Sequence, residues 1–220
     1  MIAKLPRWIW SGAWALAFVA GMINVVGLLG FEHQAVTHLT GTTSMLGAAL
    51  ASGDGEMILH FSSVIGSFLA GAALSGIIIQ DSVLKIGRRY GVALILESVV
   101  LFAAVPLLGR HWKLGLYLAA AACGLQNAMV STYSGAVMRT THVSGMFTDL
   151  GISIGHAIRR LPVDMLRLKL CCLIISAFFL GGVVGAWIFQ RIDYNTLMIP
   201  AGLTGLAAIS YGLYEWRLAR

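Results

Sequence analysis

The sequence predicts an all-α integral membrane protein of six transmembrane helices and two short half-helices, arranged as an inverted-topology internal repeat. Three observations predict this fold. Only 11% of the 220 residues are charged and 58% are hydrophobic, whereas a soluble domain carries about 25% charged residues. Six apolar runs reach the ~20 residues that a transmembrane helix needs. A polar, glycine-containing motif occurs once in each half of the chain.

The six apolar runs lie at 8–31, 57–80, 90–109, 114–133, 168–190 and 197–216. Trp and Tyr lie near the ends of these runs, as the aromatic belts of membrane proteins predict. The first run follows Lys4 and Arg7 and so resembles a signal peptide. It is longer than the ~7–15 apolar residues of a signal peptide, and we therefore expect it to remain as a transmembrane helix.

The two half-helices are predicted at 37–51 and 141–157. At 1.5 Å per residue, a helix of about fifteen residues reaches roughly 22 Å, which is short of the ~30 Å hydrocarbon core. We therefore expect each half-helix either to enter and leave the membrane on one side or to complete a broken helix.

The distribution of basic residues favours six crossings with both termini in the cytoplasm. Cytoplasmic segments typically carry an excess of Lys and Arg. The six-span arrangement places three of these residues outside, namely Arg110, Lys113 and Arg191, and the other twelve of the fifteen inside. An eight-span arrangement, in which both half-helices cross, would place ten inside and five outside. Six crossings fit better.

The repeat divides the chain into halves at 1–112 and 113–220, which form one membrane domain. The motif reads THLTG at 37–41 and THVSG at 141–145, and AGMIN at 20–24 matches CGLQN at 123–127. Three crossings in each half invert the second half relative to the first. Inverted repeats with short, glycine-interrupted segments are typical of secondary transporters, whose binding site lies near mid-membrane.

The motif residues precede or open the half-helices. Unpaired N–H groups and a partial positive charge mark a helix N-terminus. Thr40, Thr42 and Ser144 are of N-cap type, and Gly41 and Gly145 would let a ligand approach the backbone. For any single hydroxyl, capping of a helix end is the favoured interpretation. For the duplicated motif, a binding site is favoured. The candidate substrate-binding residues are Asn24, Thr37, His38, Thr40, Gly41, Thr42, Gln126, Asn127, Thr141, His142, Ser144 and Gly145.

His38 and His142 occupy equivalent positions in the two motifs, which favours substrate contact or proton handling because histidine titrates near neutrality. Asp149, whose counterpart is Met45, and Glu97 are acids inside apolar segments. An acid there is by default a functional hypothesis, and we name both as candidates for proton or ion coupling. The competing interpretation of Asp149 is an ion pair with Arg139 or a cap on local N–H groups.

Other functional classes have little support in the sequence. We expect no enzyme, because the chain contains no HExxH, no Ser/His/Asp order and no paired catalytic carboxylates. We expect no metal and no cofactor, since neither Cys nor a carboxylate recurs beside the histidines. Cys123, Cys171 and Cys172 lie in apolar runs without ligand spacing. The net charge of +6 is spread between apolar runs, so we expect no nucleic-acid partner.

The sequence resembles the YoaK-like family of small bacterial inner-membrane proteins. The resemblance covers nearly the whole chain and rests on AGxxN at 20–24, THLTGTT at 37–43 and GLQNA at 124–128. Its most specific part is RTTHVSGMFTDLG at 139–151. The resemblance implies a multi-pass protein of the bacterial inner (cytoplasmic) membrane, and it implies no particular substrate.

Together these observations predict a transporter of a small solute, an anion or a dipolar metabolite, that works by alternating access between the paired motifs, with proton coupling as an option. The alternatives are a small-solute or ion channel, and a structural or assembly protein whose polar motifs only satisfy helix ends. The expected partners are the lipid bilayer and a small-molecule or ion substrate. A homodimer is compatible with so small a helical body.

Overall fold

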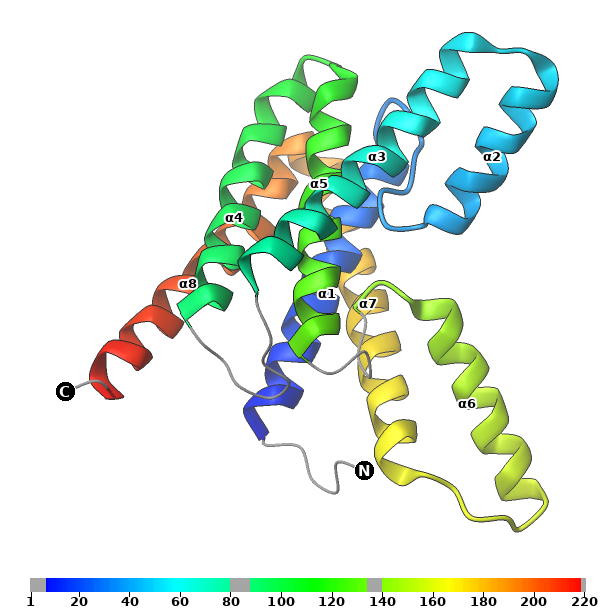
Figure 1. The fold of residues 1–220 in the computed structure, drawn as a ribbon, viewed down its shortest axis with the longest axis vertical. Coiled ribbons are helices and arrows are strands. Elements are labelled where there is room, and N and C mark those ends of the chain that lie inside the picture. The colour runs from blue at the N-terminus through cyan, green and yellow to red at the C-terminus, as the bar shows by residue number, and fades with distance from the viewer. Residues whose placement is uncertain (1–6, 80–87, 134–139, 219–220) are drawn as a thin grey trace.

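The computed structural model describes residues 7–79, 88–133 and 140–218, and these residues are predominantly α-helical (Figure 1). Gln80, where the second predicted helix ends, and Arg139, the predicted partner of Asp149, lie outside the described residues. The helices are α1 (Arg7–Leu29), α2 (Leu39–Ser52), α3 (Gly55–Ile78), α4 (Arg88–Gly109), α5 (Lys113–Tyr133), α6 (Val143–Ile158), α7 (Met165–Ile192), the 3-10 helix η1 (Asp193–Leu197) and α8 (Met198–Leu218).

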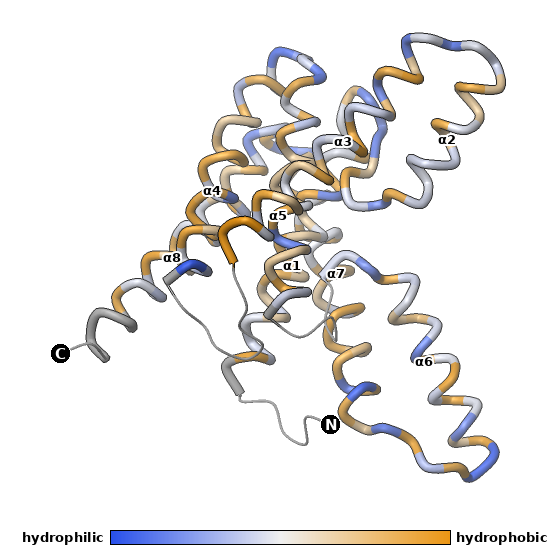
Figure 2. Tube along the Cα trace, in the orientation of Figure 1, coloured by the Kyte–Doolittle hydropathy of each residue, from blue (hydrophilic) through white to orange (hydrophobic). Residues whose placement is uncertain are grey.

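Five segments of the described chain are long and apolar enough to cross a membrane. They are Ile9–Leu29, Gly55–Ile78, Arg89–Gly109, Lys113–Thr132 and Met165–Leu213. The last segment has 49 residues and contains α7, η1 and α8. Hydrophobic residues dominate these long helices, while hydrophilic residues gather at the connections (Figure 2). The chain is therefore a multi-pass membrane protein whose exposed apolar side chains contact lipid.

Two close helix crossings organise the fold. α1 packs along α7, and α3 packs along α5. At the first crossing, a Cβ added to Gly21 would collide with the Phe178 carbonyl, and one added to Gly181 would collide with the Phe18 carbonyl. Small residues permit such approach of backbones inside a membrane.

The second crossing repeats this arrangement with different residues. A Cβ on Gly71 would collide with the Ala121 carbonyl, and a Cβ on Gly124 would collide with the Phe68 carbonyl. Three of the four contacting segments read Phe-x-x-Gly, and the fourth reads Ala-x-x-Gly. The third helix of each chain half thus packs against the first helix of the other half.

α4 completes the body by packing between α5 and α8. The Ser98 hydroxyl on α4 donates to the Ala201 carbonyl on α8 at 2.7 Å. This buried hydrogen bond joins two helices that lie far apart in the sequence. Pro106 lies further along α4.

The two short helices are attached more loosely. α2 has 14 residues and packs on α3, and α6 has 16 residues and packs on α7. In Figure 1, α2 rises from mid-height and its chain returns along α3, whereas α6 descends from mid-height and its chain returns along α7. Both helices are too short to span a ~30 Å hydrocarbon core on their own.

Candidate functional site

The N-terminal ends of α2 and α6 are built in the same way. Each helix is preceded by the motif histidine in the N-cap position, with φ −99° and ψ 64° at His38 and φ −91° and ψ 53° at His142. Neither imidazole makes a side-chain capping hydrogen bond. The prediction that Thr40, Thr42 and Ser144 are N-caps is wrong, because the helices start at Leu39 and Val143 and these hydroxyl residues lie inside them.

The motif glycines make room for the motif histidines. A Cβ at Gly145 would lie 2.7 Å from Nδ1 of His142, and a Cβ at Gly41 would lie 3.2 Å from Nδ1 of His38. Each imidazole therefore lies over the glycine of the first helical turn. The spacing His-x-x-Gly is explained by this packing, in both copies of the motif.

Two hydroxyls of the motif form the same hydrogen bond in both copies. The Ser44 hydroxyl donates to the Thr40 carbonyl at 3.1 Å, and the Thr148 hydroxyl donates to the Ser144 carbonyl at 3.1 Å. Such bonds to the carbonyl four residues earlier satisfy a hydroxyl within its own helix. For Ser44 and Thr148, the local interpretation is therefore sufficient.

Thr42 is more deeply placed than its neighbours. It is 1% exposed. Its hydroxyl donates to the His38 carbonyl at 3.2 Å and accepts a 2.9 Å hydrogen bond from the Gln34 amide. Gln34 is itself 5% exposed. Gln34 was not among the predicted site residues, although its position just before the first motif could have indicated it.

Asn24 joins α1 to the first motif. Its Oδ1 accepts hydrogen bonds from the Thr37 backbone N–H at 3.1 Å and from the Thr37 hydroxyl at 2.8 Å. A backbone N–H can only donate, so the atom facing Thr37 must be the amide oxygen. Thr37 is 8% exposed. These two bonds hold the start of α2 against the C-terminal part of α1.

The second motif has a different anchor. Gln126 on α5 donates to the Leu16 carbonyl on α1 at 2.6 Å and lies 3.4 Å from the Thr140 hydroxyl, just before α6. Among the described residues, the side-chain amide oxygens Oε1 of Gln126 and Oδ1 of Asn127 are buried without a hydrogen-bond partner. Asn127 is the sequence counterpart of Asn24, so the two copies differ in how their amides are used.

Asn24 also lies close to the N-terminal ends of both α2 and α6. It lines a groove of about 470 Å³ together with Val143 and Phe147, which belong to the first turns of α6. In the described part of the chain, α2 and α6 do not pack on each other. His38, Thr40, His142 and Ser144 are exposed, whereas Gly41, Thr141 and Gly145 are half-buried.

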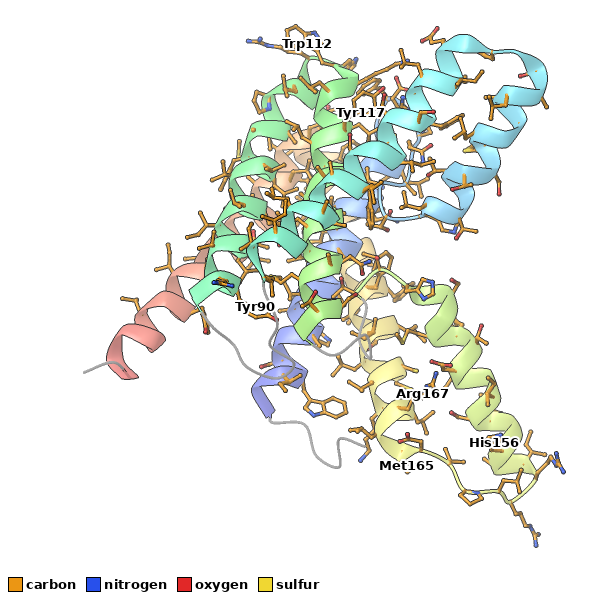
Figure 3. All side chains as sticks on the ribbon, viewed as in Figure 1. Tyr90, Trp112, Tyr117, His156, Met165 and Arg167 are labelled. Carbon is orange, nitrogen blue, oxygen red and sulfur yellow. The ribbon has the colours of Figure 1, made fainter. Side chains whose placement is uncertain are left out.

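Asp149 has a partner that the sequence analysis did not name. Its carboxylate forms two hydrogen bonds with the Arg167 guanidinium, at 2.8 and 3.0 Å. Figure 3 shows Arg167 in the space between α7 and α6. The pair joins α6 to α7 through Arg167, whereas the predicted partner, Arg139, lies outside the described residues.

Glu97 has no such partner among the described residues. It is 0% exposed on α4, and both of its carboxyl oxygens are buried without a hydrogen bond. Its helix, α4, packs against α5. A buried carboxyl without a partner is costly, so nothing in the described part of the chain explains Glu97 structurally.

Comparison with protein families identifies the relatives of this chain. The family described as "Protein of unknown function (DUF1275)" matches residues 12–210. The chain belongs to the DUF1275 family. No curated protein matches it, and no solved structure matches it. The match includes both motifs, Asn24, Glu97 and all four crossing glycines of this DUF1275 protein.

A polar network that the sequence analysis missed lies at the upper end of the DUF1275 fold. Lys113 on α5 contacts Glu56 on α3 at 2.8 Å and Glu32, between α1 and α2, at 3.7 Å. His60 contacts the Glu32 carboxylate at 3.6 Å, and its Nδ1 lies 3.2 Å from the Tyr117 hydroxyl. Tyr117 lies below Trp112 in Figure 3. No local pattern signals this network, because its members come from three separate segments.

Among the described residues, no three His, Cys, Asp or Glu side chains are placed to hold a metal ion. Cys123 and Cys171 are buried and Cys172 is exposed, all as free thiols. The chemistry available near the motifs is therefore that of amides, hydroxyls, imidazoles and backbone N–H groups.

The Asn24 anchor should be measurable as stability. Asn24→Leu leaves the Thr37 N–H without its partner and should lower the free energy of unfolding by about 1–3 kcal/mol. Thr37→Val removes one donor and retains the backbone bond, and should cost only about 0.5–1.5 kcal/mol. Denaturant unfolding in micelles measures both changes. Equal costs for the two variants would contradict the assigned bonds.

Proposed function

We propose that this DUF1275 protein is a transporter of a small solute that binds near mid-membrane beside the paired motif ends and moves by alternating access. The observation that carries the proposal is the duplicated helix entry. Both motifs place a histidine at the N-cap over a glycine, at the start of a helix too short to cross the membrane. Short helices whose N-termini point to mid-membrane form substrate sites in secondary transporters.

The helix arrangement supports an inverted repeat of six crossings. α1 and α7 run upward in Figure 1, whereas their counterparts α5 and α3 run downward. The two glycine crossings use equivalent residues, with Gly21 and Gly181 in one and Gly124 and Gly71 in the other. We assign α1, α3, α4, α5, α7 and α8 as the spans, and α2 and α6 as re-entrant half-helices. The halves 1–112 and 113–220 are the repeats.

Glu97 is the stronger candidate for proton or ion coupling. Asp149 already holds two hydrogen bonds from Arg167, which explains that residue structurally. Glu97 is buried without a hydrogen-bond partner among the described residues, on a helix that packs against α5, which carries Gln126. Because Gln126 contacts Thr140 just before the second motif, a charge change at Glu97 has a short route to that motif.

The network around Lys113 makes the contacts at one end of the membrane domain differ from those at the other end. Glu32 joins the connection between α1 and α2 to α3 and α5 through His60 and Lys113. By the repeat, His60 corresponds to Leu170 and Lys113 to Trp10. The upper face of the fold is thus closed by polar contacts, whereas the residues equivalent to His60 and Lys113 are not charged.

The orientation and location follow from the same proposal. In the six-span arrangement, twelve of the fifteen Lys and Arg residues fall on the same side as the two termini, which supports cytoplasmic termini. We propose a location in the bacterial inner membrane, which the YoaK-like resemblance supports. We propose no enzymatic activity. A channel is the alternative within transport, and uptake against a concentration gradient would exclude it.

The glycine of the second motif provides a sharp test. Gly145→Ala places a Cβ 2.7 Å from Nδ1 of His142 and displaces the imidazole from the helix end. We expect solute binding to weaken by at least about tenfold, a change of ~1.4 kcal/mol in binding free energy. The measurement is a thermal-shift screen of the purified protein against small anions, amino acids and other metabolites, followed by titration of each hit.

Gly151→Ala is the matched control on the same helix, because nothing lies within 4 Å of a Cβ at Gly151. It should retain the hit and, with alanine's better helix propensity, gain up to about 1 kcal/mol of stability. Loss of binding in both variants would point to helix stiffness instead of the imidazole. No hit in a broad panel, with full tolerance of Gly145→Ala and His142→Ala in cells, would favour the structural alternative.

A further inference from the structure

The connection between α1 and α2, residues 30–38, is held to the rest of the fold partly by uncharged groups. The Phe31 backbone N–H donates to the Tyr194 hydroxyl at 2.7 Å. The Thr37 backbone N–H donates to Oδ1 of Asn24 at 3.1 Å. Neither bond involves a group that titrates near neutral pH, so these two attachments persist through a moderate change of pH.

Glu32 provides a charged attachment of the same connection. Its side chain is 15% exposed, and its two carboxylate oxygens lie 3.6 Å from Nε2 of His60 on α3 and 3.7 Å from Nζ of Lys113 on α5. His60 is 3% exposed. One carboxylate thus holds the connection against two neighbouring helices, and one of its two partners is a histidine, which titrates near neutrality.

The surroundings of His60 suit a neutral imidazole. Its Nδ1 lies 3.2 Å from the hydroxyl of Tyr117, which Figure 3 labels on α5. The Tyr117 O–H can donate to Nδ1, and the ring N–H is then on Nε2, which faces Glu32. At 3.6 Å, Nε2 is too far from Glu32 for a short hydrogen bond, and Lys113 contacts the same carboxylate. A protonated ring would be buried without a close counter-charge, which is costly.

The other titratable groups on the elements around His60 do not supply that counter-charge. Glu56, in the first turn of α3, is 76% exposed and forms a 2.8 Å contact with Lys113. α2 also packs on α3 and carries no titratable side chain. The remaining titratable residues lie at other positions along their helices: Arg88, Arg89, Tyr90 and Glu97 in the opposite half of α4, Cys123 and Tyr133 on α5, and Asp54 at the N-cap of α3.

We propose that His60 is a pH sensor that releases the connection between α1 and α2 from α3 when its imidazole takes up a proton. In the released form the imidazolium reaches water, while the Glu32 carboxylate retains Lys113 as its partner. Because the released form binds the additional proton, acidification through about pH 6.5, the ordinary pKa of histidine, shifts the equilibrium toward release. Glutamate has an ordinary pKa of about 4.3, so Glu32 stays ionised in this range.

The released connection leads directly to the first motif. Residues 30–38 end where α2 begins, and Asn24 and Gln34 hold that end through Thr37 and Thr42. Loss of the Glu32 contact therefore leaves the start of α2 with fewer attachments. By the repeat, His60 corresponds to Leu170, which cannot titrate, so the sensor acts on the first motif alone. The inference stands independently of the transport proposal, because it concerns the protein without a solute.

The test is hydrogen–deuterium exchange of the full-length protein in nanodiscs between about pH 5.5 and 7.5, with rates corrected for the intrinsic pH dependence of amide exchange. The backbone amides of residues 31–37 should lose protection as the pH falls. One proton linked to release changes the equilibrium by at most about tenfold per pH unit, and we expect a loss of at least about threefold over this range. Amides in the middle of α5 are the internal reference.

Two variants assign the response to the contact between His60 and Glu32. His60→Gln retains a donor for Glu32 and an acceptor for Tyr117 but cannot titrate, so residues 31–37 should stay protected over the whole pH range. Glu32→Gln removes the carboxylate at a position outside the helices, and residues 31–37 should lack protection at both ends of the range. Glu32→Gln is also the second variant if His60→Gln does not fold.

Three other histidines among the described residues lie on or against the connection and provide matched controls. His33 and His38 belong to it, and the ring of His111 stacks on Phe31 with 5.2 Å between the centroids. A single Gln substitution at each of these positions should retain the pH response.

Two results would overturn the proposal. One is exchange of residues 31–37 that does not change with pH in the unaltered protein. The other is a response that persists in His60→Gln and disappears in one of the three control variants, which would make that histidine the sensor. Failure of solute binding in the thermal-shift screen would leave these exchange results unaffected.

Discussion

Gly181→Leu should prevent this DUF1275 protein from folding, whereas Gly182→Leu, at the next residue, should be tolerated. At Gly181 a Cβ would collide with the Phe18 carbonyl on α1, and at Gly182 nothing lies within 4 Å. A backbone carbonyl cannot move aside like a flexible side chain, so α1 and α7 would have to separate. Overpacking of this kind costs about 3 kcal/mol or more.

Size-exclusion profiles and unfolding midpoints in micelles measure the difference between the adjacent variants. By the equivalence of the two crossings, Gly71→Leu should fail in the same way, because its Cβ would meet the Ala121 carbonyl. If Gly181→Leu and Gly182→Leu had the same stability, the close approach of α1 and α7 would be contradicted.

Replacing Glu97 with methionine should stabilise the protein and abolish its coupling. Both carboxyl oxygens of Glu97 are buried without partners, and an unsatisfied buried polar group costs about 1–3 kcal/mol, more when charged. Methionine is unbranched and adapts to irregular space. We therefore expect the free energy of unfolding to rise by about 1–3 kcal/mol, while substrate-driven proton uptake by proteoliposomes is lost.

Glu56→Gln is the control for this change. Glu56 is 76% exposed and pairs with Lys113 at the surface, where an ion pair contributes about 0–1 kcal/mol. It should alter neither stability nor proton uptake appreciably. A Glu97→Met protein that is less stable than the unaltered one would indicate that Glu97 has a structural partner, and retained proton uptake would remove it from the coupling step.

These two predictions depend on different kinds of information. The match of Gly21 with Gly124 was visible as a repeat in the sequence, but nothing in the sequence distinguished Gly181 from Gly182. The distinction arises because a helix surface turns by about 100° per residue. One of the two neighbours faces α1 and the other faces the groove.

The motif residues show the same limit of sequence-based prediction within a single helical turn. His38 and His142 were recognised as equivalent, yet hydroxyl residues were predicted to cap the half-helices. The histidines hold the N-cap positions instead, and the glycines three residues later accommodate their rings. N-cap statistics favour hydroxyls, and they take no account of packing between an imidazole and the first helical turn.

Partners distant in the sequence were the least predictable feature. Asp149 was named as a coupling candidate, with an ion pair to Arg139 as one competing interpretation, and it pairs with Arg167 because α6 returns along α7. The contacts of His60 with Glu32 and Tyr117 require that α3 and α5 run side by side. Neither arrangement leaves a local pattern in the chain.

The sequence by itself determined the membrane class, the approximate helix bounds and the two short helices, because a bilayer requires each span to satisfy its backbone within a long apolar helix. Only the tertiary structure decided which glycines touch a carbonyl, which acid has a partner and where the groove opens. Those features depend on how α1 crosses α7 and α3 crosses α5, and crossings join residues that the chain separates.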